Sequence, residues 1–186
     1  MPLFQVEYPS GSLSAPQKSA LAEKLTHLLL LIEGGADTPG GRELSYVLFR
    51  EVPAEDWYVG GSSGPQYVAP GGKFIINLTI PEASTTQSFK EDIHTKVNAA
   101  LAEVLGWNSP QDGMSAWVMV REMPEGSWGA NGQTYTLERI AKHAAVPADP
   151  LRRQFVQGYF TAKGTLYGKA GFPADTSGLY KPSTNA

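Results

Sequence analysis

Two spacings of apolar residues organise the first 145 residues of this 186-residue chain. Apolar-rich runs at residues 3–8 and 74–80 predict β-strands, and two longer segments place apolar side chains three and four residues apart, the spacing of one helix face. The helical positions are Leu21, Leu25, Leu28, Leu29 and Ile32 in the first segment and Ile93, Val97, Ala100, Leu101 and Val104 in the second. The pattern therefore predicts two strand–helix pairs.

Both expected helices carry signals at their ends. Ser14 with Gln17, and Ser84 with Gln87, fit the capping box, in which a serine caps the helix and a glutamine three residues on reaches back. Gly34 and Gly106 are typical of helix C-termini. Within the first helix, the apolar run at residues 28–32 nearly encircles one turn. We expect a neighbouring subunit to bury part of that run.

An internal repeat relates the two halves. Residues 45–53, SYVLFREVP, recur 71 positions later as residues 116–124, AWVMVREMP. The same offset relates Trp57 to Trp128 and Gly61 to Gly132, and it sets Pro2 against Lys73. Because the second helix pattern lags by 72 positions, a one-residue insertion lies in a loop. Such a duplication indicates one structural unit used twice.

The order of elements in each copy is strand, helix, strand. A helix that crosses over between two parallel strands makes a βαβ unit, which is almost always right-handed. Two copies predict an α/β (α+β) fold: a four-stranded sheet with two helices on one face, whose other face is left to be covered. We expect the repeats to occupy residues 1–70 and 71–145, with a separate arm over residues 146–186.

Pro2 is the first candidate for chemistry. An initiator methionine before proline is normally removed, so we expect the mature chain to begin with a secondary amine. The unperturbed pKa of an α-amino group, roughly 8, is close enough to neutrality for a pocket to make the amine a free base. The structural alternative is that proline opens a strand where its missing N–H costs nothing.

A hairpin motif adds to this picture. Residues 51–61, EVPAEDWYVGG, match the pattern E-[MV]-x4-aromatic-x2-G-G. With Pro2 and the duplication, the chain resembles the tautomerase superfamily, typified by 4-oxalocrotonate tautomerase, and its fused two-repeat members. The resemblance implies Pro2 as the catalytic residue, a small-molecule substrate, no cofactor and a homotrimer. It also implies that Trp57 or Trp128 lines the pocket, and we favour Trp128 because family pockets are built between repeats.

The chain departs from the family at its substrate-binding positions. The carboxylate-binding arginines of the family tautomerases fall on residues that are not basic, namely Ser12, Tyr46, Ala83 and Trp117. Without an arginine to make a bidentate clamp, a dicarboxylate substrate is disfavoured. The dehalogenase arginine pair falls at residues 80–83 and the water-activating glutamate near Ala130, so hydrolytic dehalogenation is disfavoured too.

Other residues could supply the missing groups. Arg50 and Arg121 share side-chain parity with Tyr46 and Trp117 and could reach a pocket edge. Alternatively, each arginine pairs with an acidic neighbour such as Glu51 or Glu122. Candidates for orienting a carbonyl or an oxyanion are Tyr46, Trp117 and Asn131. We expect Lys73, which replaces the proline in the second copy, to be a solvated residue at a strand end.

Composition narrows the function classes. The chain has no cysteine, and its three histidines form no ligand spacing, so we expect no metal. A net charge of −3 argues against nucleic-acid binding. The longest apolar run is too short to span a membrane, and the N-terminus lacks signal-peptide features. We expect a cytoplasmic protein with no nucleic-acid or membrane partner.

The arm at residues 146–186 differs in charge from the rest. It carries a net charge of +3, which leaves −6 on the body. Asp149-Pro150 predicts a short helix through Leu151, Phe155, Val156 and Tyr159, and the later glycines and prolines predict an extended arm. Six aromatic residues argue against disorder: Phe155, Tyr159, Phe160, Tyr167, Phe172 and Tyr180. We expect the arm to wrap over the acidic body or a neighbouring subunit, or else to bind a partner.

Three functions remain in view. The favoured one is a tautomerase-type isomerase that catalyses keto–enol proton transfer on a small carbonyl or 2-hydroxy-dienoate compound, with Pro2 as general base. A second is a hydratase or decarboxylase that uses protonated Pro2 as the acid, which a pH–rate profile distinguishes. A third is a non-catalytic trimeric binding protein of the same fold.

Overall fold

The computed structural model describes residues 2–34 and 37–179. The first repeat forms β1 (Leu3–Pro9), α1 (Ala15–Glu33), α2 (Pro39–Leu44) and β2 (Tyr46–Val52). The second forms β3 (Phe74–Pro81), α3 (Gln87–Leu105) and β4 (Ala116–Met123), followed by the short strands β5 (Gly129–Ala130) and β6 (Gln133–Thr134). Three 3-10 turns lie in the connections: Ala54–Asp56, Pro65–Tyr67 and Pro110–Ser115.

The four long strands form one sheet in the order β2-β1-β3-β4. Each repeat contributes a parallel pair, β1 with β2 and β3 with β4, and the antiparallel pairing of β1 with β3 joins the repeats. Leu3 lies opposite Tyr46 on one side and Thr79 on the other. Because β1 and β3 are antiparallel, the two repeats start at opposite ends of the sheet.

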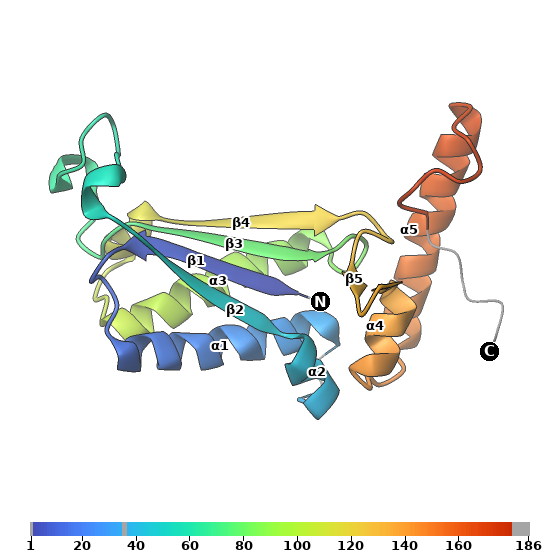
Figure 1. Ribbon diagram of the computed structural model, residues 1–186, viewed down its shortest axis with the longest axis horizontal. Helices are drawn as coiled ribbons and strands as arrows, with labels where there is room; N and C mark the ends of the chain where they lie inside the picture. Colours follow the sequence, from blue (N-terminus) through green and yellow to red (C-terminus); the bar gives the residue numbers. More distant parts are fainter. Residues whose placement is uncertain (1, 35–36, 180–186) are drawn as a thin grey trace.

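Both long helices cover the same face of the sheet, as expected (Figure 1). Residues of even number on β1 and β3 point toward the helices, because side chains alternate between faces along a strand. They bury the core with the inner faces of α1 and α3. The largest fully buried side chains include Phe4, Val6, Tyr8, Phe74, Ile76, Leu78 and Ile80 from the strands and Leu21, Leu25, Leu29, Ile93 and Leu101 from the helices.

The opposite face of the sheet carries no helix from the described residues. Its two edge strands leave large apolar side chains accessible: Tyr46 is 47% exposed, Leu48 49%, Trp117 69% and Met119 39%. Exposed apolar surface of this kind marks an interaction surface more often than a solvated one. We refer to these four residues and their sheet face as the open face.

The helix ends confirm most of the capping predictions. Ser14 caps α1 in a full capping box with Gln17, and Gly34 and Gly106 follow the two long helices. The prediction for Ser84 was wrong. Thr86 caps α3 by accepting the backbone N–H of Phe89, at 3.3 Å, so the helix begins two residues later than the motif suggested.

The apolar run at residues 28–32 does not need a second subunit. Leu28, Leu29, Leu30 and Ile32 are all buried within the chain, and only Leu31 is exposed, at 48%. The expectation of a neighbouring subunit was wrong for these four residues and stays a prediction for Leu31 alone. Arg152 and Val146, far along the chain, lie against the end of the helix at Gly34.

Each repeat ends in a tight hairpin. In the second, β5 and β6 flank Asn131 and Gly132, whose φ angles of 51° and 68° are both positive. Two central residues with positive φ make the turn type that suits hairpin strands, and Asn-Gly is its preferred sequence. Gly60 and Gly61 occupy the same place in the first repeat, between the bridged residues Val59 and Ser62.

Two further helices, α4 (Leu137–His143) and α5 (Pro150–Lys169), lie beyond the end of the sheet where β5 lies (Figure 1). The prediction of an extended arm after a short helix was wrong, because α5 continues for 20 residues and contains three glycines. Each glycine costs roughly 1 kcal/mol in a helix. The Asp149 cap, the burial of Phe160 and a Lys163–Glu82 ion pair at 2.7 Å oppose that cost.

The rest of the arm is only partly described. Phe172 stacks on Tyr167 just beyond α5, with ring centroids 4.9 Å apart. Tyr180, Lys181 and Pro182, which belonged to the expected arm, lie outside the described residues. No helix in the described part of the chain is long and apolar enough to cross a membrane.

Candidate active site at the start of β1

Pro2 is buried where β1 begins. Its carbonyl oxygen accepts the backbone N–H of Tyr46 at 3.3 Å, which ties it to the start of β2. Pro2 has the same parity as Phe4 and Val6, so its ring lies on the helix-covered side of the sheet. The chain therefore holds its candidate base in a covered position.

The directions of the strands determine at which end of the sheet each of the other predicted site residues lies. Tyr46 opens β2, Arg121 lies near the end of β4, and Trp128 and Asn131 belong to the hairpin after β4; all four are at the Pro2 end. The Lys73 end holds the remaining three: Arg50, Trp57 and Trp117. Within one chain the structure thus brings four of the seven companions to Pro2's end of the sheet.

Trp128 is the aromatic residue of the hairpin at the Pro2 end. Its backbone carbonyl accepts the N–H of Tyr135, at 2.8 Å, and its indole Nε1 is buried with no hydrogen-bond partner among the described residues. A shallow hollow of about 430 Å³ is lined by residues 126–134, Trp128 included. Asn131 forms the exposed turn of the same hairpin.

The two candidate arginines point away from the buried side of Pro2. Arg50 is on the open face and lies 3.8 Å from Glu7 of β1. Arg121 is exposed and shares that face. The acidic partners suggested for them are bonded elsewhere, because Glu51 pairs with Lys18 at 2.6 Å and Glu122 with Lys90 at 3.1 Å. These two lysine–glutamate pairs occupy equivalent places in the repeats.

Lys73 is not the solvated residue expected from its position. It is buried, and its ammonium group donates to the carbonyl oxygens of Trp57, at 2.7 Å, and Ser63, at 3.3 Å. A lysine can bury its aliphatic stem while its charged end reaches polar atoms. Lys73 therefore fastens the first hairpin to the start of β3, the place that Pro2 takes in the first repeat.

The end of α1 brings a carboxyl group to the Pro2 end. Glu33 is the last residue of α1 and is only 8% exposed. Burial raises the pKa of its carboxyl to about 7, since water no longer stabilises the charged form. The positive charges of the chain's amino terminus and of Arg152 oppose that effect. A carboxyl of this kind changes its charge near neutral pH.

Arg152, in the first turn of α5, is the cation that the sequence analysis did not single out. Its guanidinium donates to the carbonyl oxygen of Ile32 at 2.9 Å, and burial lowers its pKa. Asp149 caps α5 through the N–H groups of Leu151 and Arg152. The Asp-Pro helix start was visible in the sequence, but nothing local indicated which of the arm's cations folds back to α1.

A second polar group joins α5 to the end of β3. Glu82, just after β3, accepts both hydrogen bonds from the ammonium group of Lys163, each 2.7 Å, and one from the Tyr159 hydroxyl at 3.0 Å. Burial and the Glu82 contact raise the pKa of Tyr159 to about 12. Glu82 also accepts the backbone N–H of Glu125, whose own carboxylate accepts that of Leu137 at the start of α4. The network joins β3, α4 and α5.

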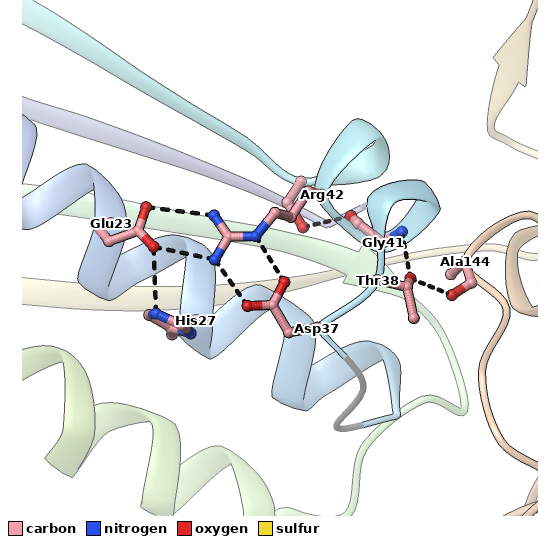
Figure 2. Close-up of polar contacts among 8 residues, drawn as sticks. Glu23, His27, Asp37, Thr38, Gly41, Arg42 and Ala144 are labelled. Carbon is pink, nitrogen blue, oxygen red and sulfur yellow. Dashed lines mark hydrogen bonds and ion pairs between the residues drawn. The ribbon is translucent and has the colours of Figure 1, made fainter.

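Arg42 of α2 is close to the Pro2 end of the sheet, but its guanidinium is already paired with two carboxylates. Figure 2 shows its guanidinium between the carboxylates of Glu23 and Asp37, with the shortest contacts 3.1 Å and 2.6 Å. Beside it, Thr38 caps α2 and donates to the carbonyl oxygen of Ala144, at 2.6 Å. Arg42 therefore fixes α2 to α1, and Thr38 fixes it to the end of α4.

The chemistry available here is proton transfer and anion binding. A buried proline, a carboxyl with a pKa near neutrality and a half-buried arginine come from β1, α1 and α5. Perturbed titratable groups gathered in one place are typical of functional sites. Among the described residues, no group of three or more histidine, aspartate or glutamate side chains is arranged to hold a metal ion.

Comparisons with known proteins agree with this architecture. Among solved structures, a fused 4-OT described as a wild-type asymmetric trimer aligns with 71% of this chain and 94% of its own, at 24% identity and a TM-score of 0.56. A member of the cis-3-chloroacrylic acid dehalogenase family covers 83% of this chain and 99% of its own, at 20% identity and a TM-score of 0.59. A third protein, inactivated by 2-oxo-3-pentynoate, covers 73% and 96%, at 16% identity and a TM-score of 0.56.

Two comparisons at the level of sequence gave different results. A search of curated proteins found no match. Residues 1–139 match a family model described as "Putative oxalocrotonate tautomerase enzyme", so the match takes in both repeats and ends within α4, before α5 begins. Since this match spans most of the chain, the protein belongs to the oxalocrotonate tautomerase family and is a fused, two-repeat member of the tautomerase superfamily.

Proposed function

We propose that this chain is a tautomerase-type isomerase that moves a proton between carbon and oxygen of a small carbonyl or 2-hydroxy-dienoate compound. Pro2, exposed as an amine once Met1 is removed, is the general base. The observation that carries the proposal is the burial of Pro2 at a sheet end where Glu33, Arg152 and Trp128 are also found. Membership of the family supports the same reading.

The reaction needs one proton carrier. The free amine of Pro2 takes the proton from the enol hydroxyl, or from the carbon beside the carbonyl, and returns it to the other position, so no other reactant is consumed. A general base of this kind contributes about 10²- to 10⁴-fold to the rate, most effectively when its pKa is near the working pH. Burial of Pro2 favours the neutral amine.

Arg152 is our candidate for binding a substrate carboxylate. It replaces the family arginines whose positions here hold serine, tyrosine, alanine and tryptophan. A guanidinium offers five donors, of which one is used by Ile32, and it binds carboxylates in a bidentate manner. Since Arg152 belongs to α5, beyond the family match, the preferred substrate is expected to differ from the family's dicarboxylate.

We propose further that the chain assembles as a homotrimer through the open face. Its apolar residues at Tyr46, Leu48, Trp117 and Met119 are exposed in the single chain. The fused 4-OT relative is described as a trimer. Burying this face between subunits removes the largest accessible apolar side chains of the sheet from water.

The test of the proposed reaction begins with the intact mass of the purified protein, which reports whether Met1 is removed. Ketonisation of phenylpyruvate and of 2-hydroxymuconate is then measured for the wild type, Pro2→Ala and Pro9→Ala. We expect Pro2→Ala to lose about 10²-fold or more in kcat/KM. Pro9→Ala, at the other end of the same strand, should retain it. Equal activity of Pro2→Ala and wild type, or retention of Met1, contradicts the proposal.

A chemical probe gives a second readout. In 2-oxo-3-pentynoate the alkyne carbon farther from the ketone accepts a free amine; a new C–N bond forms there, one π bond of the alkyne is lost, and the amine proton moves to the alkyne carbon next to the ketone. We expect one equivalent of this reagent to label the peptide that begins with Pro2, as mapped by mass spectrometry. Label found only on lysine side chains would indicate that Pro2 is not a reactive amine.

A further inference from the structure

The lengths of β1 and α1 bring Glu33 to the level of Pro2. The helix returns along the strand, and at about 1.5 Å per residue its 19 residues span roughly 28 Å, against roughly 23 Å for the seven residues of β1. The last turn of α1 therefore reaches and slightly passes the start of the strand. Since Pro2 has the parity that faces the helices, its ring and the end of α1 lie on the same side of the sheet.

The electrostatics of Glu33 agree with this geometry. The charge of the chain's amino terminus is the largest of the effects that lower the pKa of Glu33 against its burial. Removal of one residue moves the amine along the chain by no more than about 3.8 Å. The amine of Pro2 then takes over as the terminal charge beside Glu33.

The other charged groups around Glu33 come from three elements. Arg152 of α5 acts on it while donating to Ile32, and His143 at the end of α4 also acts on it, while bonding Glu43 of α2 at 3.0 Å. Asp149, which caps α5, acts on Arg152 in turn. Glu33 is the one buried carboxylate among them; Asp149 and Glu43 are exposed.

We propose that Glu33 is a positioning residue of the proposed active site, which sets the charge of the Pro2 amine and is itself held by the first turn of α5. The inference rests on the proposed function. It makes α5 part of the active site, because Arg152 bonds Ile32 and lies against Gly34, the two residues on either side of Glu33.

The consequence is a proton shared between two groups. An ionised Glu33 stabilises the ammonium form of Pro2 and raises its pKa, whereas a protonated Glu33 leaves the amine free. Two groups coupled in this way titrate in steps that belong to the pair. The state of Glu33 therefore decides whether Pro2 acts as a base at a given pH or as the acid that a hydratase or decarboxylase needs.

The direct test is the titration of the Pro2 amine by 15N NMR in protein labelled at its 14 prolines, because only the terminal amine titrates. We expect Glu33→Gln to lower the pKa of this amine by about one unit or more, because the negative charge is lost. The acidic limb of the pH–rate profile, on which activity rises as the base loses its proton, should move to lower pH by the same amount. Glu33→Asp, which keeps the charge, should restore most of the shift.

The matched control is Glu55→Gln, an exposed carboxylate at the other end of the sheet, which should leave the titration unchanged. In the wild type, the amine signal should show a second inflection near the pH at which Glu33 ionises, a measurement that does not depend on any variant folding. An amine pKa that is the same in wild type and Glu33→Gln, or a wild-type curve with one inflection, overturns the inference.

Failure of the inference and failure of the proposed function give different results. If Pro2→Ala is inactive but Glu33→Gln leaves the amine titration unchanged, the proline-base reaction stands and Glu33 has no part in it. If Pro2→Ala is as active as the wild type, the reaction is wrong, and the amine titration still reports whether Glu33 and Pro2 are coupled. Retention of Met1 overturns both.

Discussion

Adjacent arginines on α5 have unlike surroundings. Arg152 is half-buried and bonded to the end of α1, whereas Arg153 is exposed on the next face of the helix. The two arginines are neighbours in the sequence, but their side chains have different burial and different hydrogen-bond partners in the fold. It therefore offers a matched comparison for the role of Arg152 in binding a substrate carboxylate.

We predict that Arg152→Ala lowers kcat/KM for phenylpyruvate about 10- to 100-fold, the equivalent of losing one hydrogen-bonded charge pair of roughly 1.5–3 kcal/mol. The loss should appear mainly in KM and should be about 10-fold smaller for phenylacetaldehyde, which lacks the carboxylate. Arg153→Ala should behave as the wild type with both compounds. Equal losses for the two substrates would show instead that Arg152 only maintains the structure.

Lys73 shows the same dependence on surroundings. Its counterpart in the first repeat is Pro2, and from its place at a strand end we expected a solvated side chain. In the fold its ammonium group bonds the carbonyl oxygens of Trp57 and Ser63 and lies 6.0 Å from the centre of the Trp57 ring. The position has become a structural attachment of the first hairpin.

At the scale of elements, α5 is attached by two polar contacts about three turns apart. Arg152 bonds the end of α1, and Lys163 pairs with Glu82 after β3. Much of the helix nevertheless stays exposed, including Leu151, Phe155 and Tyr159, which line a shallow hollow of about 410 Å³. The stability of the α5 attachment therefore depends on a few buried charges more than on apolar area.

We predict that Lys163→Met loosens α5 from the sheet. The substitution leaves Glu82 as a buried carboxylate without its cation, and breaking a buried pair in this way costs about 3–5 kcal/mol. Hydrogen exchange should become faster at the amides of residues 150–169 than at those of α1 and α3. Lys169→Met, an exposed lysine on the same helix, should exchange as the wild type does. If both variants exchange alike, the ion pair does not hold the helix.

At the scale of the whole molecule, the two faces of the sheet differ in what covers them. One face is filled by α1 and α3, and the core between them contains the largest buried side chains. The open face keeps its apolar residues accessible in the chain as described. A second copy of the chain is the occupant that we propose for it.

We predict that Leu48→Arg converts the proposed trimer to monomers, as measured by light scattering after size-exclusion chromatography. A charge in an apolar interface is left without water or a partner. Leu31→Arg is the control, because Leu31 is exposed to the same degree, 48% against 49%, but lies on the helix side of the molecule. A trimer that survives Leu48→Arg, or is equally lost in Leu31→Arg, would exclude the open face as the interface.

The amino-acid sequence by itself determined the repeated unit, the order of its elements and most of the helix ends. The spacing of Leu21, Leu25 and Leu29 and the Ser14 capping box act between residues that are neighbours in the chain, so they can be read locally. Even there, the cap of α3 moved from Ser84 to Thr86, because three consecutive residues at positions 84–86 are all of types that cap helices.

Only the tertiary structure decided which residues lie at the Pro2 end of the sheet. Glu33 is 31 positions from Pro2 and Arg152 is 150, and no local pattern marks either one. The parallel pairing of β1 with β2 places Arg50 and Trp57 at the far end of the sheet, and the packing of α5 brings Arg152 to the near end. Burial gives Glu33 a pKa of about 7, and burial is a property of the folded chain. Pro2 could be singled out from the sequence through the repeat and the hairpin motif, whereas Glu33 and Arg152 could not, because only folding brings them to the same end of the sheet.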